Sequence, residues 1–126
     1  MGQQQLLLIV LGVIVVGIAV VVGINLFNAN AVSSNRDGVV SDLNNLGAMA
    51  QQYYKKPTSM GGGGNTFTGW VLPTQLDTTA NGNYSITVAA QSVTIVGNGT
   101  EKNDAGTNIR HTATVTPTSI TVVQNQ

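Results

Sequence analysis

Residues 6–24 form an unbroken run of nineteen uncharged and almost wholly apolar side chains. As an α-helix, at roughly 1.5 Å per residue, such a run is long enough to cross the hydrocarbon core of a bilayer, which is about 30 Å thick. The rest of the chain, about 100 residues, could form one small core, but it could not also enclose a helix that is apolar on every side. We therefore expect this segment to contact lipid, other copies of the chain, or both.

Charge is sparse and balanced, because only 8% of the 126 residues are charged and five basic residues offset five acidic ones. Such a chain has no basic face for nucleic acid. It contains no cysteine, which excludes disulfides and cysteine-based zinc sites. The length allows one small domain besides the apolar segment.

Basic residues beside a membrane helix indicate which side of it lies in the cytoplasm. In this chain the first charged residue is Arg36, on the C-terminal side of the apolar segment. A chain that started at Met1 would keep its C-terminal side in the cytoplasm by the positive-inside rule, and a removed basic leader would reverse this. A secretory signal fits poorly because its apolar core is typically about 7–15 residues. We expect the segment to be retained in the mature protein.

Three glycines interrupt the apolar segment, Gly12, Gly17 and Gly23, and Ala19 with Gly23 makes a small-xxx-small pair. Such residues let neighbouring helices approach closely, or let a helix loosen locally, and Gly17 and Gly23 are the candidates for loosening. An equally good interpretation is that these glycines have no special role, because glycine is common in membrane helices.

Beyond Asn25 the pattern becomes amphipathic, with an apolar stripe at helical spacing. The stripe consists of Val32, Val39, Leu43, Leu46, Ala50 and Tyr53. The opposite side carries Asn35, Ser41, Asn44, Asn45, Gln51 and Lys55. We predict one helix from about Gly2 to Tyr54, on the order of 80 Å long, which ends where Lys55 and Lys56 precede Pro57.

A glycine-rich loop follows at residues 60–65. It lacks the Lys-Ser/Thr ending and the strand-to-helix setting of a phosphate-binding loop, so we expect the glycines to turn the chain away from the helix. Apolar side chains are expected to anchor this loop, namely Phe67, Trp70, Val71 and Leu72.

The C-terminal part reads as four strands, at residues 84–88, 92–96, 109–116 and 119–123, with a polar loop at 98–108. One face of the sheet can pack on the helix stripe, and Thr and Ser would face solvent. That face carries Tyr84, Ile86, Val88, Val93, Ile95, Ala113, Val115, Ile120 and Val122. The predicted fold is α+β, a helix packed on a four-stranded antiparallel sheet.

The polar residues suggest no catalytic site. The single histidine, His111, lies in a predicted strand and is expected to be structural, and no nucleophile is paired with a base. We predict no enzymatic activity, no cofactor and no metal. Glu101, Asn103 and Asp104 could offer oxygens to calcium, but their spacing matches no defined calcium loop, so a solvated turn is preferred. Two triplets match the N-glycosylation sequon, at Asn83 and Asn98.

Taken together, the apolar N-terminal segment, the amphipathic continuation and the antiparallel strands resemble the type IV pilins. The resemblance implies an apolar half-helix over residues 1–28 that anchors the chain in the membrane and later forms a filament core. It also implies a small head over residues 29–126, with the amphipathic helix at 29–56, a glycine-rich loop at 57–82 and the sheet at 83–126. A basic leader removed by a prepilin peptidase would leave Met1 as the processed and methylated residue.

Three features depart from the family pattern. Most pilins carry Glu at the fifth position, to pair with a neighbour's N-terminal ammonium, whereas this chain has Gln5, whose amide cannot neutralise that charge. The proline in the middle of the apolar half and the C-terminal cysteine pair are also missing. Glutamine-rich starts are also found in archaeal pilins, so both the bacterial and the archaeal branch remain open.

The expected function is that of a structural subunit that polymerises with itself into an extracellular pilus-like filament. Its other partners would be the cytoplasmic membrane before assembly, the prepilin peptidase and the pilus assembly machinery. The residues expected to form the filament core and the membrane helix are Leu6, Leu7, Leu8, Ile9, Val10, Leu11, Val13, Ile14, Val15, Val16, Ile18, Val20, Val21, Val22 and Ile24. Two alternatives remain, a pseudopilin of a secretion system and a single-pass anchored binding protein that never polymerises.

Overall fold

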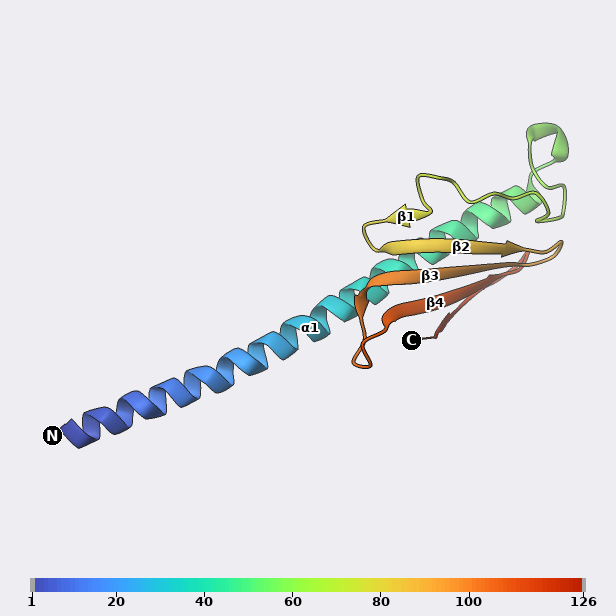
Figure 1. Cartoon of the computed structure of the whole chain (residues 1–126). Helices are drawn as coiled ribbons and strands as arrows, with labels where there is room; N and C mark the ends of the chain where they lie inside the picture. The colour runs from blue at the N-terminus through green and yellow to red at the C-terminus, as the bar shows by residue number, and fades with distance from the viewer. Residues whose placement is uncertain (1, 126) are drawn as a thin grey trace. The chain divides into compact units, whose positions relative to one another are not determined.

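The computed structural model describes residues 2–125 and consists of one long helix, a short 3-10 helix and an antiparallel β-sheet (Figure 1). The chain is α+β, as expected. Helix α1 (Gly2–Lys55) has almost the bounds that the sequence predicts. The chain divides into two compact units between Ala31 and Val32, and each is described by itself.

The sheet has five strands in chain order, β1-β2-β3-β4-β5, and each strand pairs antiparallel with the next. Their bounds are β1 (Thr78–Thr79), β2 (Gly82–Val88), β3 (Val93–Lys102), β4 (Asn108–Val115) and β5 (Ile120–Gln124). The prediction of four strands is wrong because β1 was missed. This strand is two residues long, too short to show alternation, and lies where a loop was expected.

The predicted loop at residues 98–108 is also wrong, because β3 continues to Lys102 and only a short turn separates it from β4. In that turn Oδ1 of Asn103 accepts hydrogen bonds from the backbone nitrogens of Ala105 and Thr107. Gly97 and Gly99 within β3 make the sequence look like a loop. A Cβ atom at Gly97 would lie 2.9 Å from the Val39 side chain, so glycine here lets α1 approach the strand closely.

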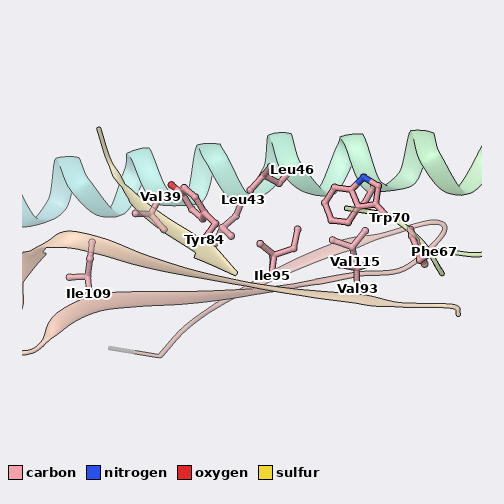
Figure 2. Packing of buried hydrophobic residues seen from close by; sticks show 12 residues of the cluster. Val39, Leu43, Leu46, Phe67, Trp70, Tyr84, Val93, Ile95, Ile109 and Val115 are labelled. Atoms are coloured by element: carbon pink, nitrogen blue, oxygen red, sulfur yellow. The ribbon is translucent and has the colours of Figure 1, made fainter. Parts of the chain in front are cut away.

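The core lies between the C-terminal part of α1 and one face of the sheet, and Figure 2 shows the side chains of both layers meeting there. The predicted helix stripe is confirmed at its centre, since Val39, Leu43, Leu46 and Ala50 are fully or almost fully buried. The sheet contributes the predicted Tyr84, Val93, Ile95, Ala113 and Val115, together with Ile109. Half-buried side chains surround this centre, including Val32, Tyr53, Ile86, Val88, Ile120 and Val122.

The glycine-rich segment closes the C-terminal end of α1. It follows the 3-10 helix η1 (Thr58–Met60) and folds back on the last helical turn. There the backbone nitrogens of Gly63 and Asn65 donate hydrogen bonds to the carbonyl oxygens of Tyr53 and Tyr54, at 2.7 and 2.8 Å. These carbonyls are among those that a helix end leaves unpaired. The segment therefore caps the helix as well as turning the chain.

Aromatic residues then hold the loop against the core. Phe67 is fully buried, its ring lies 4.8 Å from that of Tyr54, and its backbone nitrogen donates to the carbonyl oxygen of Ala90. Trp70 is also buried and Leu72 is half-buried, as expected. The prediction for Val71 is wrong, since 75% of this residue is exposed, because its two neighbours occupy the inward positions.

Candidate assembly surface on the N-terminal helix

The fifteen large apolar residues predicted for the filament core lie on α1 with exposed fractions between 51% and 68%. Successive helical positions are about 100° apart, so these side chains cover every side of the helix. By length and composition this part of α1 could cross a membrane, and none of the apolar window is buried. Within the unit that ends at Ala31, no other element covers this surface.

The exposed apolar surface includes two residues that lie within the predicted half-helix of residues 1–28 but were not among the fifteen residues named for the filament core. Leu26 is 60% exposed and Phe27 is 76% exposed, the largest value among the exposed large apolar side chains of α1. Asn25 separates them from the apolar run and hid them from a count of consecutive apolar residues. The sequence does contain a signal for these two residues, because the apolar pattern resumes directly after the single polar residue Asn25.

Glycines leave open space along the same surface. At Gly12, Gly17 and Gly23 an added Cβ atom would meet no other heavy atom within 4 Å, apart from the helix's own backbone nearby. The structure places all three within the α-helical residues of α1. A neighbouring helix has room to approach the backbone at these positions.

The start of α1 is polar but neutral. Gln3, Gln4 and Gln5 are exposed in the first two turns, and no acidic residue lies in the first turn. The amide of Gln5 can donate and accept hydrogen bonds but cannot form an ion pair. Met1, the predicted site of processing and methylation, lies outside the described residues. No charged side chain precedes Arg36, so no ion pair between side chains forms on this surface.

In the second unit, Asn35 ties α1 to the sheet. Only 8% of Asn35 is exposed, and its Nδ2 donates to the carbonyl oxygen of Asn81 at 2.7 Å. Its Oδ1 accepts from the backbone nitrogens of Thr100 and Glu101, at 3.1 Å each. The prediction that Asn35 faces solvent is wrong. It lies three residues after Val32 and four before Val39, a spacing that places it on the apolar stripe.

Asp42 receives three side-chain hydrogen bonds at its Oδ2, from Thr79, Asn81 and Tyr84. Burial by itself would raise the pKa of the Asp42 carboxyl, but the hydrogen bond from Tyr84 and then those from Asn81 and Thr79 outweigh it, so the pKa lies below its ordinary 3.8. For Tyr84, burial first and the bond to Asp42 second raise the pKa above its ordinary value. This cluster joins α1 to β1, β2 and the turn between them.

His111 is buried in β4, with 4% of the residue exposed, and its Nδ1 has no hydrogen-bond partner among the described residues. Burial lowers the pKa of the ring, and the positive charge of Arg36 lowers it further. Both effects keep the imidazole neutral. Over residues 2–125 there is no group of three or more His, Cys, Asp or Glu side chains placed to hold a metal ion.

The two sequon asparagines lie opposite each other on neighbouring strands, Asn83 on β2 and Asn98 on β3. Asn83 is exposed. Asn98 is half-buried, and its Oδ1 accepts a hydrogen bond from Nε of Arg110 at 3.0 Å. The sequence alone gave no sign that the two positions are neighbours.

Comparison with protein-family models, with curated proteins and with solved structures finds no match to this chain. Among the described residues, the exposed large apolar side chains are concentrated on the N-terminal part of α1. A helix that is apolar on all sides is solvated favourably by lipid tails or by similar helices, and unfavourably by water. Such a surface is suited to association.

Proposed function

We propose that this chain is the structural subunit of an extracellular filament of the type IV pilus kind, assembled by packing residues 6–27 of many copies together. The observation that carries the proposal is the exposure of fifteen large apolar residues on one helix. Burying a side chain of this size is worth about 1.5–3 kcal/mol, so the whole set of fifteen represents at most roughly 22–45 kcal/mol. That exceeds the usual stability of a domain, about 5–15 kcal/mol, and a surface this large requires a partner.

Because the chain resembles type IV pilins, we expect the lasting partner of the exposed apolar surface to be the same helix in other copies of the chain. The chain combines an apolar N-terminal segment with an amphipathic segment of α1 whose stripe packs on an antiparallel sheet. This order of elements is the one expected for that family. Gln5 in place of Glu implies that the copies assemble here without an ion pair at the fifth position.

Before assembly, the same surface would be solvated by the cytoplasmic membrane. A basic leader upstream of Met1 would be removed by a prepilin peptidase, and Met1 would become the methylated N-terminus. Assembly machinery would then transfer the subunit from lipid to the filament. This exchange is feasible because lipid tails and apolar side chains are similarly favourable surroundings for Leu, Ile and Val.

The test is to shear surface material from the producing cells, examine it by electron microscopy, and identify the filament protein by mass spectrometry. This chain should be the dominant component, and deletion of its gene should remove the filaments. Filaments of unchanged number and composition in the deletion strain would refute the proposal. Mass determination of the intact N-terminal peptide should show a methylated Met1.

One alternative is supported by the same exposed helix, namely a single-pass anchored protein that never polymerises. The two functions predict different fractions. An anchored protein would stay in the membrane and be extracted by mild detergent as a monomer, whereas a filament subunit would appear in the sheared material as a detergent-resistant polymer. A pseudopilin would instead form short assemblies that remain in the cell envelope.

A further inference from the structure

The outer face of the sheet is defined here as the side chains of β2–β5 that alternate with the core side chains. Strand register aligns them in rows across the sheet. One row consists of four threonines, Thr87, Thr94, Thr114 and Thr121, and each is paired with the next. Neighbouring strands are about 4.8 Å apart, so this row offers closely spaced hydroxyl groups to solvent.

Asn83 lies at one end of this face. It shares β2 with Ser85 and Thr87, and in a strand the side chains at positions i, i+2 and i+4 point to the same side. All three are exposed. Asn83 and Ser85 are the asparagine and hydroxyl residues of one sequon, and both face away from the core that Tyr84 enters between them.

The second sequon is engaged in the fold at each of its three residues. Arg110 binds the Asn98 side chain, Nδ2 of Asn108 donates to the carbonyl oxygen of Gly99, and the backbone nitrogen of Thr100 donates to Asn35. By contrast, the Asn83 side chain makes no hydrogen bond within residues 2–125. Directly opposite residues have Cβ atoms about 5 Å apart, too close for two bulky sugar chains.

The charge of the chain gives an independent reason for a sugar at this face. Net charge is zero and only 8% of the residues are charged. Proteins with net charge near zero tend to associate and precipitate unless something else keeps their surfaces apart. The threonine row contains no charged residue, so charge repulsion does not oppose contact between two such rows.

We propose that Asn83 carries an N-linked glycan, that Asn98 does not, and that the glycan lies over the hydroxyl groups of Ser85 and Thr87. The donor would be an oligosaccharide joined through a diphosphate to a polyprenol lipid. Nδ2 of Asn83 forms a bond to the anomeric carbon while the anomeric C–O bond breaks. The lipid diphosphate leaves with that electron pair, and Nδ2 gives one proton to a base of the transferase, which leaves a neutral secondary amide.

Transfer would precede folding of the sheet, because Tyr84 in the middle of the sequon is buried and its backbone nitrogen donates a hydrogen bond to the carbonyl oxygen of Asp77. The folded sheet would then accommodate a sugar on the exposed Asn83 but not on the half-buried Asn98, whose Oδ1 accepts the hydrogen bond from Arg110. The proposal requires only that the sheet reaches the outside of the cell. It does not depend on filament assembly, and the modification can be measured on chains from the membrane or from filaments alike.

The experiment is glycopeptide mass spectrometry on the full chain purified from the producing cells. No Lys or Arg lies between residues 57 and 101, and trypsin does not cleave the bond between Lys56 and Pro57. Both asparagines therefore stay on one peptide, residues 56–102. Electron-transfer fragmentation is therefore needed to locate the sugar. A sugar mass on fragments that contain Asn83, with Asn98 at its unmodified mass, is the expected result.

Three variants test the assignment. Asn83→Gln and Ser85→Ala should each abolish the added mass, since the first removes the acceptor and the second removes the sequon hydroxyl. Thr87→Ala is the matched control, because it removes an exposed hydroxyl from the same face of the same strand without touching the sequon. It should keep full occupancy. An unmodified Asn83 in the native chain, a sugar on Asn98, or an unchanged added mass in Ser85→Ala would overturn the proposal.

Discussion

The hydroxyl of Tyr84 donates a hydrogen bond to Oδ2 of Asp42 at 2.5 Å, which joins β2 to α1. Tyr84→Phe keeps the ring in the core and removes only this bond. We expect the free energy of unfolding to fall by about 1–2 kcal/mol, because a bond to a charged acceptor is stronger than a neutral one while Asp42 keeps Thr79 and Asn81. Urea denaturation of the full chain in detergent, followed by circular dichroism, measures the loss.

The matched control for that change is Tyr54→Phe, which removes an exposed bond from a tyrosine hydroxyl to the neutral amide of Gln91. Its effect should be clearly smaller. Equal losses in the two variants would show that the charge of Asp42 adds nothing to the bond with Tyr84.

Acid should destabilise the second unit through His111. Its pKa in the folded chain lies below the ordinary 6.5, so the unfolded chain binds the proton more readily. The free energy of unfolding should therefore fall as the pH decreases below 6.5, at a higher pH than any effect of Asp42, whose pKa in the folded chain lies below its ordinary 3.8. Because the chain has a single histidine, His111→Gln should flatten the stability curve in this range. An unchanged slope in that variant would exclude His111 as the cause.

Asn35→Ala should loosen the contact between α1 and the end of β3. The change leaves two backbone nitrogens and one carbonyl oxygen without their partner, with an expected loss of about 1–3 kcal/mol. Hydrogen exchange is the most specific measurement, because the amides of Thr100 and Glu101 should exchange faster while those at the centre of β4 change less. Ser34→Ala, at the exposed neighbouring position, should leave all of these rates unchanged.

Gly99→Ala should be destabilising although alanine is a small residue. The added Cβ atom would overlap Oδ1 of Asn35 and the side chain of Ile109, both of which are buried. Overpacking of this kind typically costs about 1–3 kcal/mol. Thr100→Ala, at the next and exposed position, is the control and should cost much less. A melting temperature for Gly99→Ala equal to that of the control would show that the helix can move away from the strand at no cost.

Val15→Asp tests the assembly surface in the middle of the apolar segment. An unpaired carboxylate would be placed among apolar side chains, so filament yield should drop to background. Val15→Leu keeps the surface apolar and should preserve the yield. Immunoblots of whole cells and of sheared material separate loss of assembly from loss of the protein. Normal filament yield from Val15→Asp would contradict the packing of this segment in a filament core.

The periodic parts of the fold could be predicted from the sequence. Helix α1 and the core strands follow from side-chain spacing, because burial on one face imposes a period of 3.6 residues in a helix and 2 in a strand. The stripe around Leu43 and the alternation around Ile95 are examples that the structure confirms.

The parts of the fold that depend on close backbone contacts between distant segments could not be predicted from the sequence. Gly97 and Gly99 are poor strand formers in isolation, but they are required where α1 lies close to β3, and this contact depends on residues more than fifty positions away. Asn35 looks like a solvent-facing residue by polarity alone, yet its amide forms hydrogen bonds with three backbone groups in a partly buried setting. On the candidate surface, the apolar half-helix of residues 1–28 was predicted, but Leu26 and Phe27 were not named for the filament core because Asn25 separates them from the apolar run.

The order of the strands has a consequence for how the protein forms. Each strand pairs with the strand before it in the chain, so every hairpin can close as soon as its second strand has been synthesised. Local pairing of this kind favours rapid folding. Contacts of the sheet with α1 span far longer loops, for example the 65 residues between Asn35 and Thr100, and their closure carries a larger entropic cost. The sheet should therefore form early and the helix should dock last, so the fold becomes complete only after its C-terminal strand has been made.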